Sequence, residues 1–114
     1  MKLISVSSLL YYVNDIDKSK EFYEAFGFHF DRDKDRVVTY LNWFSIELRK
    51  SDKPIDNDCG EYVYIKVDSV DEMQARLESK GVKPEGEPKD VGGGVRELQV
   101  RDPDGYRFTF FEKK

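Results

Sequence analysis

Apolar and polar side chains alternate with a period of two along several stretches of the chain, which predicts β-strands, while two longer stretches show helical spacing. In the first half, a helix is predicted to begin with Asp15 or Asp17 as its N-cap and to end at Gly27, which can adopt the left-handed conformation of a helix stop. The strands predicted around this helix cover residues 3–13, 28–33, 36–42 and 43–49.

The same order of elements returns in the second half of the chain. A strand at 61–67 leads into a helix that is predicted to start at the capping-box pair Ser69 and Glu72 and to end at Gly81. Two more strands follow on either side of the turn sequence DPDG, at 95–101 and 106–112.

Three segments without clear periodicity separate these elements. The polar stretch SDKPIDNDCG (51–60) is rich in turn-forming residues and is predicted to be a linker. Residues 82–88 contain two prolines, which favours a short edge strand, and VGGGV (91–95) is predicted to be a flexible loop.

The two halves align when the chain is shifted by 54 residues, so that Val13 falls on Val67, Asp17 on Asp71, and Gly27 on Gly81. This repeat predicts an α+β fold of two tandem βαβββ modules. Module one is expected at 1–50 and module two at 61–114, with the linker between them. A ferredoxin-like sandwich is the alternative, although it leaves one or two predicted strands unused.

Composition limits the classes of function. The chain has 114 residues, of which 37% are charged and 39% hydrophobic, and its net charge is −4. The acidic balance argues against nucleic acid or an anionic membrane as the main partner. No apolar run reaches membrane-spanning length, and no signal peptide is evident. The single cysteine, Cys59, cannot form an internal disulfide, which fits a cytoplasmic protein.

Each helix must be buried against one face of its sheet, which leaves an opposite, non-helix face. The uniformly apolar set Val63, Ile65 and Val67 is predicted to lie under the second helix. The non-helix faces then gather large side chains that need a cover. Such side chains can be covered by a second subunit, by the other half of the chain or by an organic ligand in a groove. These side chains are Leu10, Tyr12, Trp43, Tyr62, Tyr64 and Phe111.

The motifs VNDIDKSKEFYEAFGF (13–28) and VRDPDGYRFTFFE (100–112), on a doubled βαβββ plan, resemble the vicinal oxygen chelate superfamily. That superfamily contains glyoxalase I, extradiol dioxygenases, and fosfomycin- and bleomycin-resistance proteins. The resemblance covers essentially the whole chain as a single domain. It implies curved mixed sheets around a groove, and a homodimer whose subunits complete that groove.

Metalloenzymes of this superfamily hold a divalent ion with four side chains, from the first and last strand of each module. The resemblance places Ser8, Glu47, Tyr62 and Thr109 at these positions. Hydroxyl groups that stay protonated bind such ions weakly, and one carboxylate does not replace three protein ligands. We therefore expect neither a metal nor another cofactor, and the bleomycin-resistance type of ligand sequestration is the closest likeness.

Glu47 has three interpretations: an ion pair with Arg49, Lys66 or Arg107, recognition of a ligand, or general-base catalysis. The sequence favours a metal-independent protein that binds a small aromatic or cationic compound such as an antibiotic. Two alternatives remain. One is an enzyme that uses Glu47, with glyoxalase-like, other lyase or dioxygenase-type chemistry, and the other is a protein-interaction module. The predicted ligand-binding residues are Ser8, Leu10, Trp43, Glu47, Tyr62, Tyr64, Arg107, Thr109 and Phe111.

Overall fold

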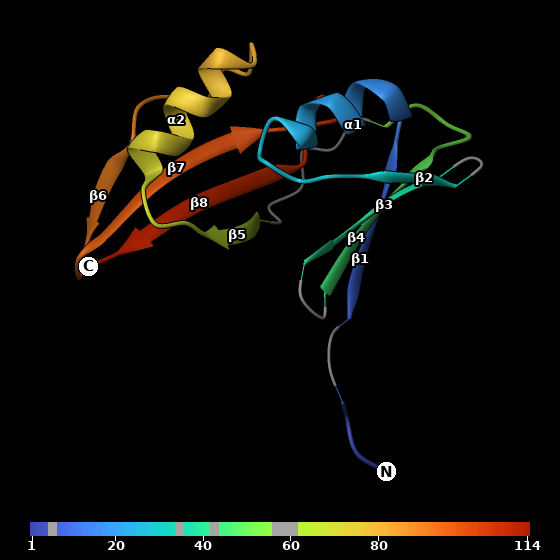
Figure 1. Ribbon diagram of the computed structural model, residues 1–114, viewed down its shortest axis with the longest axis horizontal. Coiled ribbons are helices and arrows are strands. Elements are labelled where there is room, and N and C mark those ends of the chain that lie inside the picture. Colours follow the sequence, from blue (N-terminus) through green and yellow to red (C-terminus); the bar gives the residue numbers. More distant parts are fainter. Residues whose placement is uncertain (5–6, 34–35, 42–43, 56–61) are drawn as a thin grey trace. The chain divides into compact units, whose positions relative to one another are not determined.

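The computed structural model describes residues 1–4, 7–33, 36–41, 44–55 and 62–114. They form two compact units, Met1–Ile55 and Asp56–Lys114, called module one and module two below. Each has the order strand, helix, three strands (Figure 1). Module one contains β1 (Ser8–Val13), α1 (Ile16–Glu24), β2 (Asp31–Asp33), β3 (Arg36–Leu41) and β4 (Phe44–Lys50). Module two contains β5 (Tyr62–Lys66), α2 (Val70–Ser79), β6 (Lys89–Gly92), β7 (Val95–Arg101) and β8 (Arg107–Lys113).

Both modules build the same four-stranded mixed sheet. The strand order is β1-β4-β3-β2 in module one and β5-β8-β7-β6 in module two. The first strand of each module runs parallel to the last, and the other neighbours are antiparallel. The predicted α+β fold of two tandem βαβββ modules is therefore confirmed. The boundary between the two units falls inside the segment predicted to be a linker.

The helices begin and end where the sequence indicates. In α1 the side chain of Asp15 accepts a hydrogen bond from the backbone N–H of Lys18 at 3.1 Å, and Gly27 follows the helix with φ 108°. In α2 the hydroxyl of Ser69 accepts a hydrogen bond from the N–H of Glu72 at 3.1 Å. These local bonds satisfy backbone groups that a helix end would otherwise leave unpaired.

Each helix covers one face of its own sheet and buries an apolar core there. In module one the core lies between α1 and strands β3 and β4 and includes Tyr23, Val37 and Leu48. In module two Leu77 of α2 packs over β7 and β8, where Phe108 and Phe110 are buried. Side chains on alternate positions of β1 are exposed and covered in turn, so the predicted phase of this strand, with Ser8, Leu10 and Tyr12 opposite the helix, is confirmed.

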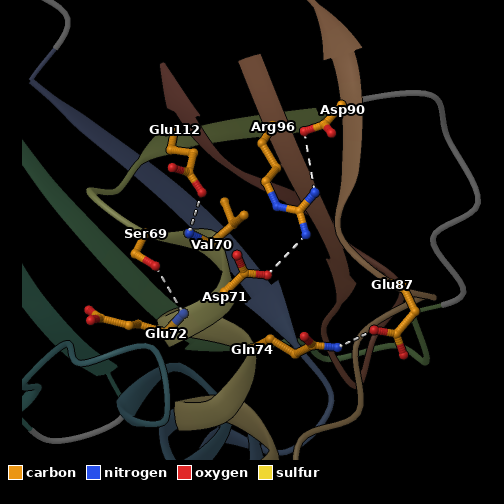
Figure 2. A network of polar contacts seen from close by, with 9 residues as sticks. All are labelled: Ser69, Val70, Asp71, Glu72, Gln74, Glu87, Asp90, Arg96 and Glu112. Carbon is orange, nitrogen blue, oxygen red and sulfur yellow. Dashed lines mark hydrogen bonds and ion pairs between the residues drawn. The ribbon is translucent and has the colours of Figure 1, made fainter. Parts of the chain in front are cut away.

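Polar contacts add to the attachment of α2 to its sheet (Figure 2). Arg96 of β7 donates a hydrogen bond to Asp71 of α2 at 3.1 Å and another to Asp90 of β6 at 3.3 Å. These two carboxylates raise the pKa of the Arg96 guanidinium. The carboxylate of Glu112 accepts a bond from the N–H of Val70 at 3.1 Å, which caps the start of α2.

Three strand predictions were wrong in their extent. The first strand begins at Ser8 rather than at residue 3, and the strand predicted at 28–33 covers Asp31–Asp33 only. Residues 82–88 form no strand, and the edge strand of module two is β6 instead. The prolines of 82–88 lack the N–H that a strand ladder uses.

The segment predicted as a flexible loop at 91–95 instead contributes to β6 and to the hairpin that joins β6 to β7. Gly93 and Gly94, with φ 63° and 76°, form this tight turn. No helix in the described ranges has the length and apolar character needed to cross a membrane.

Candidate functional site

The non-helix face of module one is organised in cross-strand rows. Strand register places Leu10 of β1 opposite Glu47 of β4, and Glu47 opposite Val38 of β3. The neighbouring row brings Arg49 opposite Arg36. Two guanidinium groups directly opposite each other repel, so this face needs a negative charge nearby.

Glu47 supplies that charge. Arg36 Nη1 donates to Glu47 Oε1 at 3.0 Å, and Arg49 Nε donates to Glu47 Oε2. The glutamate side chain is only 16% exposed, whereas the two arginines are about half exposed. Both carboxylate oxygens therefore hold charge-assisted bonds in a partly desolvated position. The predicted ion pair with Arg49 is present, and the second partner, Arg36, was missed.

Arg36 could have been found by counting. The predicted strands 36–42 and 43–49 adjoin each other, and the structure pairs Leu41 with Phe44. Counting outward from that pair in both directions brings Arg36 opposite Arg49, diagonal to Glu47. A hairpin register, once assumed, therefore indicates the partner of a partly buried carboxylate.

The non-helix face of module two carries aromatic and polar side chains. Register places Tyr64 of β5 opposite Thr109 of β8, and Lys66 opposite Phe111 in the next row. The rings of Tyr64 and Phe111 are 6.2 Å apart between centroids, at an angle of 49°. Tyr64 remains 57% exposed, so this ring pair presents aromatic surface that its own module leaves uncovered.

Thr109 is the one buried side chain on this face of β8. It is fully inaccessible to solvent, and its hydroxyl oxygen has no hydrogen-bond partner among the described residues. Leaving a buried hydroxyl unpaired costs about 1–3 kcal/mol. A position that tolerates such a cost needs an explanation. A ligand or an ordered water satisfies this hydroxyl only if the side chains that cover it move aside.

Register also shows that Glu47 and Thr109 hold equivalent places in their modules. Glu47 is opposite Leu10 in β1, and Thr109 is opposite Tyr64 in β5. Leu10 and Tyr64 are separated by 54 residues, the offset that superimposes the two halves of the sequence. The two last-strand positions assigned from the resemblance are thus related by the internal repeat.

A family model described as the glyoxalase/bleomycin resistance protein/dioxygenase superfamily matches residues 5–110. The chain belongs to this superfamily. The match covers nearly the whole sequence, and it includes both modules. It specifies the family and leaves open which of the activities in that name, if any, the chain has. No match was found among curated proteins.

Solved structures agree on the fold of this superfamily member. A hypothetical protein from S. aureus is 22% identical with a TM-score of 0.75, and the alignment covers 97% of this chain and 95% of that one. A glyoxalase/bleomycin resistance protein from Albidiferax ferrireducens is 20% identical, with a TM-score of 0.77 and coverage of 96% and 98%. A glyoxalase-related enzyme from Fulvimarina pelagi is 18% identical, with a TM-score of 0.79 and coverage of 97% and 89%.

The side chains at the superfamily's metal positions do not fit a divalent ion. Both oxygens of Glu47 are already bonded to arginines. Ser8 and Thr109 offer neutral hydroxyls, which are weak ligands for such ions. Within the described ranges, no group of three or more His, Cys, Asp or Glu side chains is arranged to hold a metal. No metal-dependent step is therefore derived for this chain.

The predicted ligand-binding residues divide between the modules. Ser8, Leu10 and Glu47 share the non-helix face of module one. The corresponding face of module two holds Tyr64, Arg107, Thr109 and Phe111, and the backbone of Tyr62 is paired with that of Arg107. Trp43 lies outside the described residues, as does Cys59.

A separate polar hollow of about 750 Å³ lies in module one, beside the start of α1. Its lining includes Asp15, Asp17, Arg32 and Lys50. Asp15 already caps the helix, and Arg32 donates to Asp17 at 2.7 Å. Three of these four side chains, Asp15, Asp17 and Arg32, thus bond to each other or to the helix end, which is a structural arrangement.

Proposed function

We propose that this superfamily member is a metal-independent protein that binds a small aromatic compound on the non-helix faces of its modules. The observation that carries the proposal is the state of Glu47. The one strong donor among the four metal positions is engaged by Arg36 and Arg49, so it serves as the counter-ion of two arginines. The shared mechanism of the superfamily's metalloenzymes, in which a metal orients two substrate oxygens, then has no basis here.

Exposed apolar and aromatic surface supports binding of an organic molecule. Tyr64 is 57% exposed, Tyr12 47% and Leu10 43%, and all three belong to non-helix faces. Aromatic rings stack on such surfaces without needing a metal. Within this superfamily, sequestration of a toxic or antibiotic compound is the form of binding that needs no catalytic group. The proposal includes a cytoplasmic homodimer, in which a second copy covers part of this surface.

Metal analysis combined with a ligand screen tests the proposal. Protein purified without chelator is analysed for bound metals, and a panel of aromatic compounds is screened for an increase in the melting temperature. We expect less than one-tenth equivalent of any divalent ion, and ligand-induced stabilisation that persists in EDTA. Binding to the native state raises stability by an amount that grows with ligand concentration.

Two results would contradict this function. A stoichiometric divalent ion that EDTA removes together with ligand binding would restore a metal-dependent activity. Turnover of a bound compound that disappears in Glu47→Gln, while binding persists, would favour the enzyme that uses Glu47 as its base. Size-exclusion chromatography with light scattering tests the homodimer independently of both.

A further inference from the structure

Four side chains form a compact square on the non-helix face of module two, called the Tyr64 square below. Tyr64 and Lys66 alternate along β5, and Thr109 and Phe111 alternate along β8. Neighbouring strands are about 4.8 Å apart and alternate side chains about 7 Å apart. The square is therefore about the size of a bicyclic aromatic ring, with two rings on one diagonal and a cation and a hydroxyl on the other.

Charge on this face is positive, although the chain as a whole has a net charge of −4. Lys66 makes no ion pair with any described residue and is exposed. Cross-strand register places further cations on the same face of the sheet, at Lys89, Arg101, Arg107 and Lys113. Among the described residues, the carboxylates near them include Glu97 on the same face of β7, Glu87, which lines a hollow with Lys89, and Glu85, which pairs with Arg101. An anion is thus the complementary partner for the square.

The Thr109 hydroxyl points to the same class of ligand. It is fully buried and has no hydrogen-bond partner among the described residues, so its desolvation cost is already present before any ligand arrives. A ligand oxygen that displaces the side chains covering this hydroxyl and accepts its hydrogen bond recovers that cost. A carboxylate oxygen is a stronger acceptor than a neutral carbonyl oxygen. The cation and the donor of the square therefore favour the same ligand group.

We propose that the Tyr64 square binds a planar aromatic carboxylate, with the ring against Tyr64 and Phe111 and the carboxylate between Lys66 and Thr109. This inference rests on the proposed function and names the chemical class of its ligand. It replaces the cationic ligand considered from the sequence, since a cation would face Lys66 without a neutralising carboxylate in the square.

Isothermal titration with three probes of one shape tests this assignment. The probes are naphthoate, naphthamide and naphthylmethylammonium, which differ in charge. At low ionic strength we expect naphthoate to bind about tenfold more tightly than naphthamide, and the ammonium compound to bind more weakly than both. High salt, about 1 M with a screening length near 3 Å, should reduce the preference for naphthoate.

Variants of the square separate its parts. Lys66→Met should weaken naphthoate binding about threefold to fivefold and leave naphthamide binding unchanged, because only the charge interaction is lost. Thr109→Val, which keeps the side-chain shape, should weaken naphthoate about fivefold to tenfold while the unliganded protein unfolds at an equal or higher temperature. Lys83→Met, at another exposed lysine, and Thr39→Val, at a buried threonine of module one, serve as matched controls.

The outcomes distinguish the two proposals. Equal affinity for naphthoate and naphthamide, or tighter binding of the ammonium probe, overturns the anionic ligand and leaves the proposed function intact. If naphthoate binds saturably and neither variant alters its affinity, the ligand lies elsewhere on the protein. That result overturns the assignment of the ligand to the Tyr64 square. Absence of binding by all three probes contradicts both proposals, and a Thr109→Val protein less stable than the wild type shows that its hydroxyl is satisfied.

Discussion

Arg36 and Arg49 lie directly opposite each other across β3 and β4, and both bond to the carboxylate of Glu47. Like charges in a cross-strand pair destabilise a sheet, so the register of this hairpin depends on the glutamate between them. This arrangement gives a structural role to a side chain that the resemblance places at a metal position. These ion pairs give the glutamate a role that needs no metal.

Replacement of this carboxylate should destabilise the protein. We expect Glu47→Gln to lower the free energy of unfolding by about 1–3 kcal/mol, because two charge-assisted hydrogen bonds weaken and two arginines are left without their counter-ion. Chemical denaturation monitored by circular dichroism measures the change. A metal ligand with no structural role would instead leave the metal-free protein as stable as before.

A second variant serves as the control for this prediction. In Glu47→Gln combined with Arg49→Met, one of the two repelling charges is also gone. The double variant should recover part of the lost stability. With the single variant Arg49→Met also measured, the double-variant change minus the sum of the two single-variant changes gives the coupling energy of the pair. Strict additivity of the two substitutions would contradict the ion-pair network at this position.

The fold could be predicted from the sequence because the pattern of apolar residues and the signals for helix ends occur in the same order in both modules. The apolar set Val63, Ile65 and Val67 falls on one face with period two, and capping residues mark where each helix begins. Residues 82–88 were wrongly predicted because an edge strand has no strong apolar pattern. A proline-containing segment and a glycine-rich one are then equally plausible candidates from the sequence.

The candidate site could be predicted only in part. Alternation along a strand assigns Tyr64 and Thr109 to the face opposite the helix, and the structure places them opposite each other. Thr109 is buried, and its hydroxyl has no hydrogen-bond partner in the described part of the chain. Both properties depend on how neighbouring side chains pack, which the pattern of residues along the chain does not contain.

The turn before β8 should depend on one carboxylate. Asp102 is only 5% exposed, and its Oδ1 accepts hydrogen bonds from the N–H groups of Asp104 at 2.9 Å and Tyr106 at 2.8 Å. Asp102→Ala leaves these groups without that acceptor and should lower the free energy of unfolding by about 2–4 kcal/mol. Asp102→Asn, which keeps a neutral acceptor, should lose less. Thermal unfolding of both variants measures the two losses of stability. Equal losses would contradict the role of the side-chain oxygen as a hydrogen-bond acceptor in this turn.

The start of α2 should depend on two side chains from different parts of module two. Ser69 caps the helix locally, and Glu112 reaches the N–H of Val70 from β8. We expect Ser69→Ala to cost about 1 kcal/mol and Glu112→Ala about 0.5–1 kcal/mol. Hydrogen exchange of the Val70 amide should accelerate in Glu112→Ala. Glu97→Ala, on the neighbouring strand, is the control and should leave that amide unchanged.

The stabilising effect of Arg96 should be constant across neutral and moderately alkaline pH. Hydrogen bonds to Asp71 and Asp90 raise the pKa of this arginine above its ordinary value. A group whose pKa is raised by folding stabilises the folded state fully below its unfolded pKa, and loses that effect only as the pH rises through the folded pKa. For an arginine, both the unfolded and the folded pKa lie far above neutrality. The melting temperature of Arg96→Met should therefore fall below that of the wild type by the same amount at about pH 6.5 and about pH 9.5.

Arg96→Lys should recover little, since an ammonium group lacks the planar fork with which Arg96 reaches α2 and β6 together. A difference between wild type and Arg96→Met that changes steeply over this interval would show that another titrating group controls the contact.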